Sequence, residues 1–423
     1  MLSVSRAGLL RWASVLVAAI AAAVVVGRVR GEEPLRYVLT DTEQGVWLED
    51  FALKAADLSG AGHGWSITKR TLRGGVQDGV DLITLDNGQL TIRVVPTRGM
   101  SVLDVRQGDF RLGWESPVKE LVHPALVNLD SRGGLGWLQG FNEWMVRCGL
   151  EFAGHPGTDE VIDNTGATSS VPLTLHGRIG NLPASRVEVL IDREAPHRLR
   201  VRGVVHERWF MGAKLELATE ISTEPGSDRL TIEDAVTNRG GTPQEFQLIY
   251  HANYGTPLLE EGAKVVTAAK RVAPMNEHAA GAIGHYDTYG KPEAGFVEEV
   301  FLVWPYADEE GHARVLLHDA AGERAASIRW SVEQLPYLTI WKNTAAAEDG
   351  YVTGLEPATG FPFNRGVERA AGRVPTLGPG QTRQFALEFG VHEGRDAVAR
   401  EAAAIEAIQH GRATTVDEQP PVD

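Results

Sequence analysis

Three side chains that could carry protons follow stretches with the composition of β-strands. Glu356 comes after a Tyr-Val-Thr run and precedes a Pro-rich turn, while His176 and His251 follow apolar runs and precede small or amide residues. A carboxylate and an imidazole suffice for general acid–base catalysis, because one accepts a proton while the other donates one. Singly, each has a simpler interpretation, as a solvated glutamate or as a core histidine with satisfied nitrogens. An acid–base site therefore requires that the fold bring the three together.

The long segment between residues 108 and 181 is less periodic than its surroundings and is rich in Trp, Gly and Pro. Long irregular insertions in a β scaffold usually build binding sites. Tryptophan rings could stack on a sugar face or simply pack in the core; the candidates are Trp114, Trp137, Trp144 and, from a later segment, Trp341. Arginines could bind hydroxyls or an anionic substituent, or form structural ion pairs; the candidates are Arg98, Arg147 and Arg178.

Metal and nucleophile chemistry have weaker support. Possible metal ligands are His123, His155, His176, His251 and Glu151, but the sequence contains no His-x-x-x-His or Cys-x-x-Cys spacing. It also contains no Gly-x-Ser-x-Gly, and the single cysteine, Cys148, is interpreted as a small buried residue. We therefore expect no metal and no other cofactor.

Alternation of apolar and polar residues indicates the scaffold. It recurs in short segments separated by turn residues such as Asp86-Asn-Gly88. The segments are 81–85, 90–95, 102–106, 186–191, 199–205, 214–221 and 230–236. The pattern predicts an all-β fold, a large antiparallel β-sandwich. Few helices are expected, with one Ala-rich amphipathic helix near the C-terminus, over residues 395–409.

The N-terminal residues predict export. A basic start, an apolar run over residues 12–26 and a small-residue exit are typical of a secretory signal peptide, and the 15-residue run is short for a membrane span. An uncleaved signal anchor is the alternative, and either places the globular part in the periplasm or outside the cell. The predicted organisation is a signal over residues 1–31, edge strands in an extension over 32–78, the sandwich over 79–393, the helix over 394–412 and a disordered tail over 413–423.

The net charge of -15 argues against nucleic acid and against anionic membrane surfaces as partners, since both require a basic footprint. A membrane is expected as a partner only if the N-terminal segment stays uncleaved. A small molecule is the favoured partner. The sequence does not indicate an oligomeric state.

The order of His176-Gly, His251 followed by Asn253-Tyr, and Leu355-Glu-Pro ending in Asn364 resembles the aldose 1-epimerase (galactose mutarotase-like) superfamily. Further motifs are similar to its DUF4432 branch, from roughly residue 80 to 392: Val95-Pro-Thr-Arg98-Gly-Met-Ser, Leu112-Gly-Trp114-Glu-Ser-Pro, Gly136-Trp137-Leu, Arg147-Cys-Gly-Leu-Glu151, Leu175-His-Gly-Arg178 and Trp341-Lys342-Asn343. The resemblance implies a galactose mutarotase-like supersandwich and a carbohydrate ligand.

The resemblance also implies roles for individual residues. Glu356 would be the base, His251 the acid, and His176 would hydrogen-bond and polarise the sugar while anomers of a hexose or modified hexose interconvert by ring opening. Burial against aromatic rings should raise the pKa of Glu356. The further substrate contacts implied are Arg98, Arg178, Asn253, Trp341, Lys342, Asn364 and Trp137.

Two alternatives to this isomerase stay open. One is a non-catalytic carbohydrate-binding sandwich, which would bind sugar with or without Glu356. The other is a carbohydrate lyase or hydrolase that uses the same carboxylate and histidines. This chain has Ala252-Asn-Tyr-Gly255 where typical mutarotases continue with a Tyr-Phe-Asn-Leu type of run. The identity of the sugar, including whether it is anionic, is therefore open.

Overall fold

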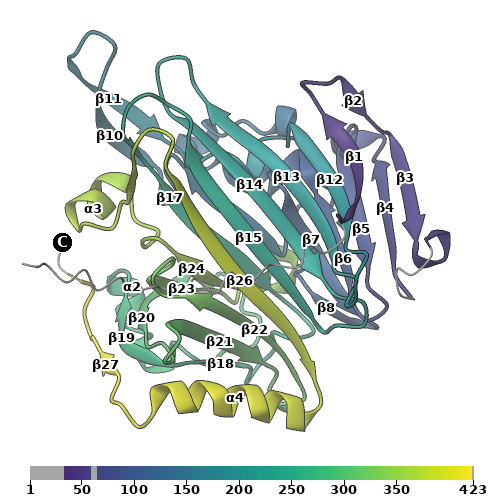
Figure 1. The fold of residues 1–423 in the computed structure, drawn as a ribbon. Coiled ribbons are helices and arrows are strands. Elements are labelled where there is room, and N and C mark those ends of the chain that lie inside the picture. The colour runs from purple at the N-terminus through teal and green to yellow at the C-terminus, as the bar shows by residue number, and fades with distance from the viewer. Residues whose placement is uncertain (1–32, 59–63, 422–423) are drawn as a thin grey trace, which may run out of the picture. The chain divides into compact units, whose positions relative to one another are not determined.

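The computed structural model describes residues 33–58 and 64–421. Two large sheets dominate it (Figure 1), and their strands pair antiparallel, with one parallel exception at the edge strand β27. The all-β prediction is confirmed. The smaller sheet has ten strands, in the spatial order β18 (Lys264–Thr267), β21 (His312–His318), β22 (Arg324–Ser331), β26 (Thr382–Glu393), β15 (Arg229–Asn238), β14 (Lys214–Thr223), β13 (Leu199–Arg208), β12 (Arg186–Ile191), β1 (Leu35–Asp41) and β2 (Val46–Trp47).

The larger sheet has thirteen strands. Its order is β27 (Thr415–Val416), β19 (Ala269–Pro274), β20 (Glu299–Pro305), β23 (Tyr337–Asn343), β24 (Val352–Ala358), β17 (Gln247–Tyr254), β9 (Met145–Leu150), β7 (Ser101–Gln107), β6 (Thr91–Val95), β5 (Asp81–Asp86), β4 (Ser66–Thr71) and β3 (Asp50–Lys54), with β8 (Phe110–Leu112) paired to β7. Two small sheets pair β10 (Gly157–Ile162) with β11 (Thr168–Leu173) and β16 (Gln244–Glu245) with β25 (Thr376–Leu377).

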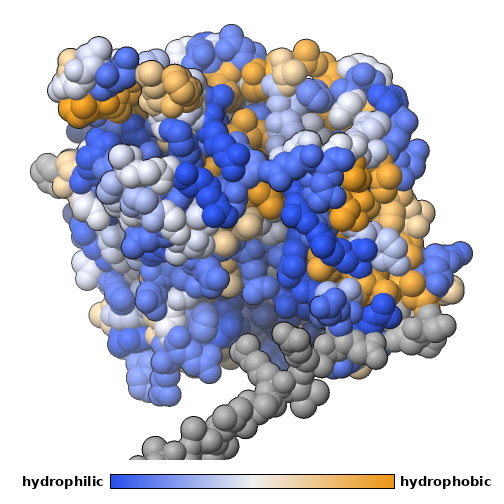
Figure 2. All heavy atoms as spheres, turned by 45° about the horizontal axis from the view of Figure 1, so that its top comes forward, coloured by the Kyte–Doolittle hydropathy of each residue, from blue (hydrophilic) through white to orange (hydrophobic). Residues whose placement is uncertain are grey.

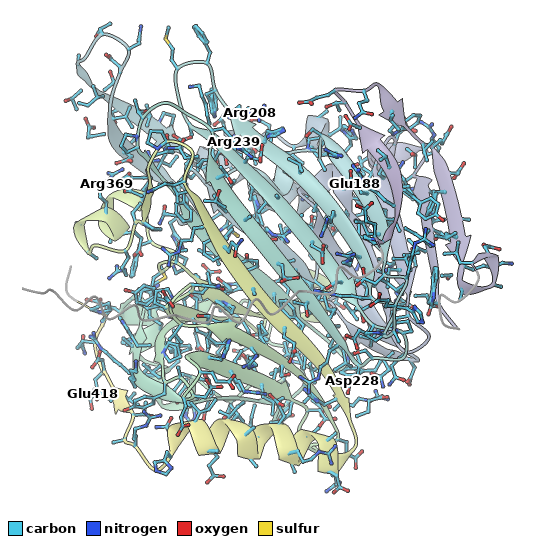
Figure 3. All side chains as sticks on the ribbon, viewed as in Figure 1. Glu188, Arg208, Asp228, Arg239, Arg369 and Glu418 are labelled. Atoms are coloured by element: carbon cyan, nitrogen blue, oxygen red, sulfur yellow. The ribbon has the colours of Figure 1, made fainter. Side chains whose placement is uncertain are left out.

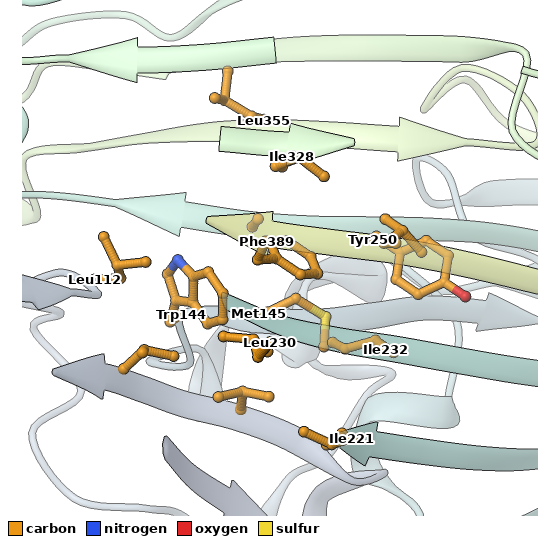
Figure 4. Close-up of a cluster of buried hydrophobic side chains, with 14 of the residues drawn as sticks. Leu112, Trp144, Met145, Ile221, Leu230, Ile232, Tyr250, Ile328, Leu355 and Phe389 are labelled. Atoms are coloured by element: carbon orange, nitrogen blue, oxygen red, sulfur yellow. The ribbon is translucent and has the colours of Figure 1, made fainter. Parts of the chain in front are cut away.

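The main hydrophobic core lies between the two large sheets and takes side chains from both. In β13, buried and more exposed residues alternate, so one face packs inward and the other meets solvent. Figure 4 shows a part of this core. The larger sheet contributes the labelled side chains Leu112, Met145, Tyr250 and Leu355, together with Trp144, which directly precedes β9. The smaller sheet contributes Ile221, Leu230, Ile232, Ile328 and Phe389.

The central strands of the larger sheet are buried on both faces. Every residue of β9, β17 and β24 is buried, because irregular segments cover the face that points away from the main core. A second apolar cluster forms there and contains Trp114, Trp137, Phe141, Cys148 and Ile249. Two-sided burial explains why β17 and β24 lack the alternation that marks β13.

The α-helices of the described residues are few. They are α1 (Ser131–Gly134), α2 (Glu277–Ala280), α3 (Arg365–Ala370) and α4 (Arg395–Gln409). The predicted C-terminal helix is confirmed by α4, which packs Val398, Ile405 and Ile408 against residues of the smaller sheet and its surroundings. In the part of the chain that the structure describes, no helix combines the length and apolar character needed to cross a bilayer.

Two terminal predictions have different outcomes. The tail from residue 413 was expected to be disordered, but Thr415–Val416 forms β27, which pairs parallel with β19, and Asp417 forms an ion pair with Arg271. A two-residue strand is too short to be indicated by composition. The predicted signal over residues 1–31 lies outside the described residues.

Figure 2 turns the top of Figure 1 forward and shows a face that is mostly hydrophilic, with separate hydrophobic clusters. The described residues with the most exposed large apolar side chains include Ile162, at the end of β10, and Phe210 and Met211, between β13 and β14. Both hairpins project at this end of the sheets (Figure 1).

An ion pair buried between the sheets supplies a test of the fold. Arg147 of β9 and Asp234 of β15 are fully buried, and removing one partner of such a pair leaves an uncompensated charge. We predict that Asp234→Ala lowers the free energy of unfolding by about 3–5 kcal/mol, measured by urea denaturation.

The control is Asp228→Ala. Asp228 lies just before β15 (Figure 3) and its side chain is 49% exposed, so its removal should change stability by less than about 0.5 kcal/mol. Equal losses in the two variants would contradict the prediction.

Candidate functional site

Glu356 and His251 meet on the covered face of the larger sheet. Their strands, β24 and β17, pair antiparallel, and the register that sets Ala252 against Leu355 and Ile249 against Ala358 places His251 opposite Glu356. The distance from His251 Nε2 to Glu356 Oε1 is 3.3 Å. The two residues are only 4% and 2% exposed. The acid–base pair expected from the sequence is therefore assembled by direct strand pairing.

Gly354 leaves open the space in which the side chains of Glu356 and His251 meet, a role that was not predicted from the sequence. It shares a strand face with Glu356, and a Cβ there would lie 2.5 Å from Glu356 Oε1 and 3.2 Å from both His251 Cε1 and Trp341 Cε3. The signal for it is a glycine inside a β-favouring run, which commonly marks a close approach.

His176 reaches the same place from an irregular turn. It adopts a left-handed conformation with φ 59°, followed by Gly177, also left-handed. Its Nδ1 lies 3.0 Å from the carbonyl oxygen of Ala153. A carbonyl only accepts, so Nδ1 carries the proton and Nε2 is left as an acceptor in the neutral ring. The rings of His176 and His251 are 5.3 Å apart, edge to face.

Aromatic rings surround the two histidines. The Trp137 ring lies 4.7 Å from that of His176, and Phe141 and Trp341 each lie 5.4 Å from that of His251. Trp341 donates its indole N–H to Glu298 over 2.8 Å. Trp137 and Trp341 were expected at the site, whereas Phe141 was missed because a lone Phe in an irregular segment carries no distinguishing pattern.

Burial sets the protonation of all three groups. It raises the pKa of Glu356 well above its usual range, with a further contribution from the negative charge of Glu298. Burial lowers the pKa of His251 well below its usual range, with help from His176, and lowers the pKa of His176 to about 4. These shifts favour the uncharged form of the Glu356 carboxyl and of both imidazoles.

Asn253 also belongs to this site. It lies two residues from His251 on the same face of β17, and its side-chain amide donates to the backbone oxygens of Glu143 and His251, each over 3.1 Å. These two bonds hold the Asn253 side chain beside the backbone of His251, and its Oδ1 is buried without a hydrogen-bond partner.

The structure assigns the two predicted arginine contacts to other partners. Arg98 is fully buried, pairs with Glu143 over 2.6 Å and donates to Asn181 Oδ1 over 2.9 Å. The guanidinium of Arg178 stacks over the Trp209 ring at 4.3 Å, against the hairpin between β13 and β14. Both side chains stabilise the walls of the site, and their structural interpretation is the one that the contacts favour.

Lys342 and Asn364 also point to other partners. Lys342 alternates with Trp341 along β23, so it lies on the opposite face, where it donates to the backbone oxygen of His285 over 2.9 Å and pairs with Glu299 at 3.3 Å. Asn364 caps α3 by accepting the N–H of Gly366 over 2.9 Å. Composition does not reveal which face a residue next to Trp341 occupies.

Three further sequence candidates have structural positions. Arg147 lies in the core between the sheets, and Trp144 packs there on Phe389 at 5.1 Å. Cys148 is buried, and burial raises the pKa of its thiol well above the usual range. Within residues 33–58 and 64–421, no group of three or more His, Cys, Asp or Glu side chains is placed to hold a metal ion.

Comparisons with known proteins identify the family and the fold. The family model "Domain of unknown function (DUF4432)" matches residues 77–391. A candidate aldose 1-epimerase from Klebsiella pneumoniae is 40% identical, with a TM-score of 0.87 over 92% of this chain and 100% of that chain. A galactose mutarotase-like protein from Clostridium acetobutylicum is 14% identical, with a TM-score of 0.54 over 77% of this chain and 98% of that chain, which supports the fold alone. No curated protein matches the chain.

Gly354 permits a direct test of the site geometry. A methyl group added by Gly354→Ala would displace the flexible end of Glu356 rather than backbone, so the protein should fold while the contact with His251 is lost. We expect a clear change in the NMR signals of the His251 ring. Gly241→Ala, where a Cβ meets nothing within 4 Å, is the control and should leave that ring unchanged. An unaltered His251 signal in Gly354→Ala would show that the contact does not depend on this space.

Proposed function

We propose that this chain, which belongs to the DUF4432 family, is a carbohydrate isomerase that interconverts the anomers of a hexose or modified hexose in the manner of an aldose 1-epimerase. The observation that carries the proposal is the 3.3 Å contact between His251 Nε2 and Glu356 Oε1. One carboxylate and one imidazole are the two groups that ring opening requires.

The reaction begins with a cyclic sugar. A base removes the proton of the anomeric hydroxyl, the bond from the anomeric carbon to the ring oxygen breaks, and an acid protonates that oxygen. After the open-chain carbonyl rotates, the same groups act in reverse, and either anomer forms. Protons are conserved over the cycle, so a pair that holds one proton is sufficient.

Glu356 and His251 meet this requirement. The directions of the two pKa shifts favour a protonated carboxyl beside a neutral imidazole, and moving that proton from Oε1 to Nε2 produces a carboxylate base and an imidazolium acid. The buried setting makes the two charges costly unless they form together, beside each other. Glu356 is then the base, His251 the acid, and the unprotonated Nε2 of His176 accepts a hydrogen bond from a sugar hydroxyl.

Unpartnered polar atoms support a hydroxyl-rich ligand. Among the described residues, the indole N–H of Trp137 and the hydroxyl of Thr339 are buried without a hydrogen-bond partner. Trp137 touches both histidines, and Thr339 lies opposite Glu356 in the sheet. Buried polar groups are normally satisfied, and sugar hydroxyls can both donate and accept.

The charges favour an uncharged sugar. Arg98 pairs with Glu143, Lys342 pairs with Glu299 and Arg178 stacks on Trp209, while the negative charge of Glu298 contributes to the raised pKa of Glu356. A phosphate or sulfonate beside Glu298 would be repelled. We therefore expect neutral hexoses to react faster than their phosphorylated or sulfonated forms.

Anomer exchange measured by NMR on neutral, phosphorylated and sulfonated hexoses tests this proposal. We predict that Glu356→Gln slows exchange by about 100-fold or more, because the amide cannot take up the proton. Glu233→Gln, whose side chain is 50% exposed, is the matched control and should retain full activity.

The alternatives have distinct outcomes. Ligand line broadening that wild type and Glu356→Gln share, without accelerated exchange, would indicate a binding protein. A new reducing end would indicate a hydrolase or lyase. Full activity in Glu356→Gln would refute the catalytic assignment.

The histidine protonation states permit a second test. The pKa of His176 is lowered to about 4 by burial, against about 6.5 in an unfolded chain. We expect the NMR signals of its ring to titrate near pH 4. Because the unfolded chain binds this proton more readily, the stability contributed by the neutral ring is complete above about pH 6.5 and declines as the pH falls toward 4. A midpoint near 6.5 would show that the ring is solvated and would contradict the site's burial.

A further inference from the structure

A cationic groove lies on the face of β4, β6, β7 and β8 that points away from the core between the sheets. It measures about 560 Å³. Two carboxylates, Glu115 and Glu120, line it together with six cationic side chains: Arg70, Arg73, Arg93, Arg106, Arg111 and Lys119. This composition is unexpected in a chain with a net charge of -15.

Three of these arginines converge on one carboxylate. Asp104 is fully buried beneath them. Arg93 donates hydrogen bonds to both carboxylate oxygens, with its Nε 2.5 Å from Oδ1. The Nε atoms of Arg106 and Arg111 donate to Oδ2 over 3.1 and 3.2 Å. Burial alone would raise the pKa of Asp104, but the hydrogen bond and charge of Arg93, with the other two arginines, lower it overall. The carboxylate thus contributes a single negative charge against three positive ones.

The strand register adds to the imbalance. Arg93 lies opposite Asp104, which is a favourable pair, but Arg106 lies opposite Arg111. Like charges directly opposite each other in a sheet are destabilising. The sequence therefore keeps an unfavourable cross-strand pair at the centre of the groove.

Neighbouring carboxylates balance the charge at one end of the groove but not around Asp104. Glu115 is shared between Arg111 at 2.5 Å and Lys119 at 3.7 Å, and Glu49 pairs with Arg73. For Arg70, which is exposed, no ion pair occurs among the described residues. Asp50 lies opposite Arg70 in the sheet, and Glu49, Asp50 and Asp78 act on Arg73, so that end of the groove is balanced. At the other end, four cations, Arg93, Arg106, Arg111 and Lys119, face three carboxylates, Asp104, Glu115 and Glu120, which leaves one positive charge uncompensated.

We propose that this groove binds an oxyanion, the phosphate, sulfate or carboxylate group of a small molecule, between Arg93, Arg106 and Arg111. The paired N–H donors of a guanidinium group match the geometry of an oxyanion. Salt screens the attraction between the arginines and an anion less in a partly buried groove than at an exposed surface. An oxyanion bridging Arg106 and Arg111 would also relieve their mutual repulsion.

The groove is separate from the Glu356 site but adjoins its wall. Trp114 lines the groove and packs on Phe141 at 4.8 Å, and Phe141 packs on His251 at 5.4 Å. The oxyanion site does not depend on the proposed isomerase activity, and either can fail without the other.

Titration of the full chain with inorganic phosphate, followed by calorimetry at low ionic strength, tests the proposal. We expect saturable binding that weakens as salt is added. Arg106→Gln should weaken it about tenfold, because Arg106 is 49% exposed and its ion pair is with Asp104 alone among the described residues, so its loss removes a donor without disturbing the core.

The matched control is Arg271→Gln. Arg271 is 42% exposed and pairs with one aspartate, Asp417, at the opposite edge of the same sheet, so this variant should bind phosphate as wild type does. A hexose 6-phosphate that binds more tightly than inorganic phosphate would identify an organic anion as the ligand, and equal affinities would identify the free oxyanion. Absence of saturable binding, or equal weakening in the two variants, would overturn the proposal.

Discussion

The buried ion pair between Arg147 and Asp234 is the constraint on which the rest of the structure depends. The pair crosses from the larger sheet to the smaller, and Tyr250 donates its hydroxyl to the same aspartate over 2.8 Å. The remaining guanidinium N–H groups reach Thr219 and the backbone oxygens of Gly99 and Met100. A charge so far from water is tolerated only when its donors are satisfied, so the relative positions of the sheets are closely specified.

That constraint extends to the site through one strand. Tyr250 and His251 are neighbours on β17, so when the tyrosine faces the ion pair the histidine must face the opposite side. A register shift of one residue would exchange them, burying the imidazole against Asp234 and removing it from Glu356. The register of β17 that forms the buried ion-pair network is therefore also the register that places His251 beside Glu356. Holding the acid–base pair on central strands, instead of on loops, also suits a reaction that needs precise placement of two groups.

Much of the architecture was predictable from the sequence, because strands with one solvated face, such as β13 and β14, keep a period of two. The proposed site residues Glu356, His251 and His176 could be grouped only by family resemblance, since β17 and β24 are buried on both faces and show no alternation. The protein partners of the arginines were not predictable for a related reason. Composition indicates that Arg98 can bind an oxygen, but not that Glu143, distant in sequence, already provides it. Gly354 and Phe141 matter through packing that no local pattern encodes.

The short pairing of β27 with β19 has a consequence for assembly. β19 would otherwise be the last strand of the larger sheet, with a row of free N–H and C=O groups able to recruit a strand from another molecule. Thr415 and Val416 cover part of that edge, and the ion pair of Asp417 with Arg271 holds them there. The pairing of β27 thus protects this edge from pairing with a strand of another molecule. A fusion or purification tag placed after Asp423 would be attached close to the strand that gives this protection.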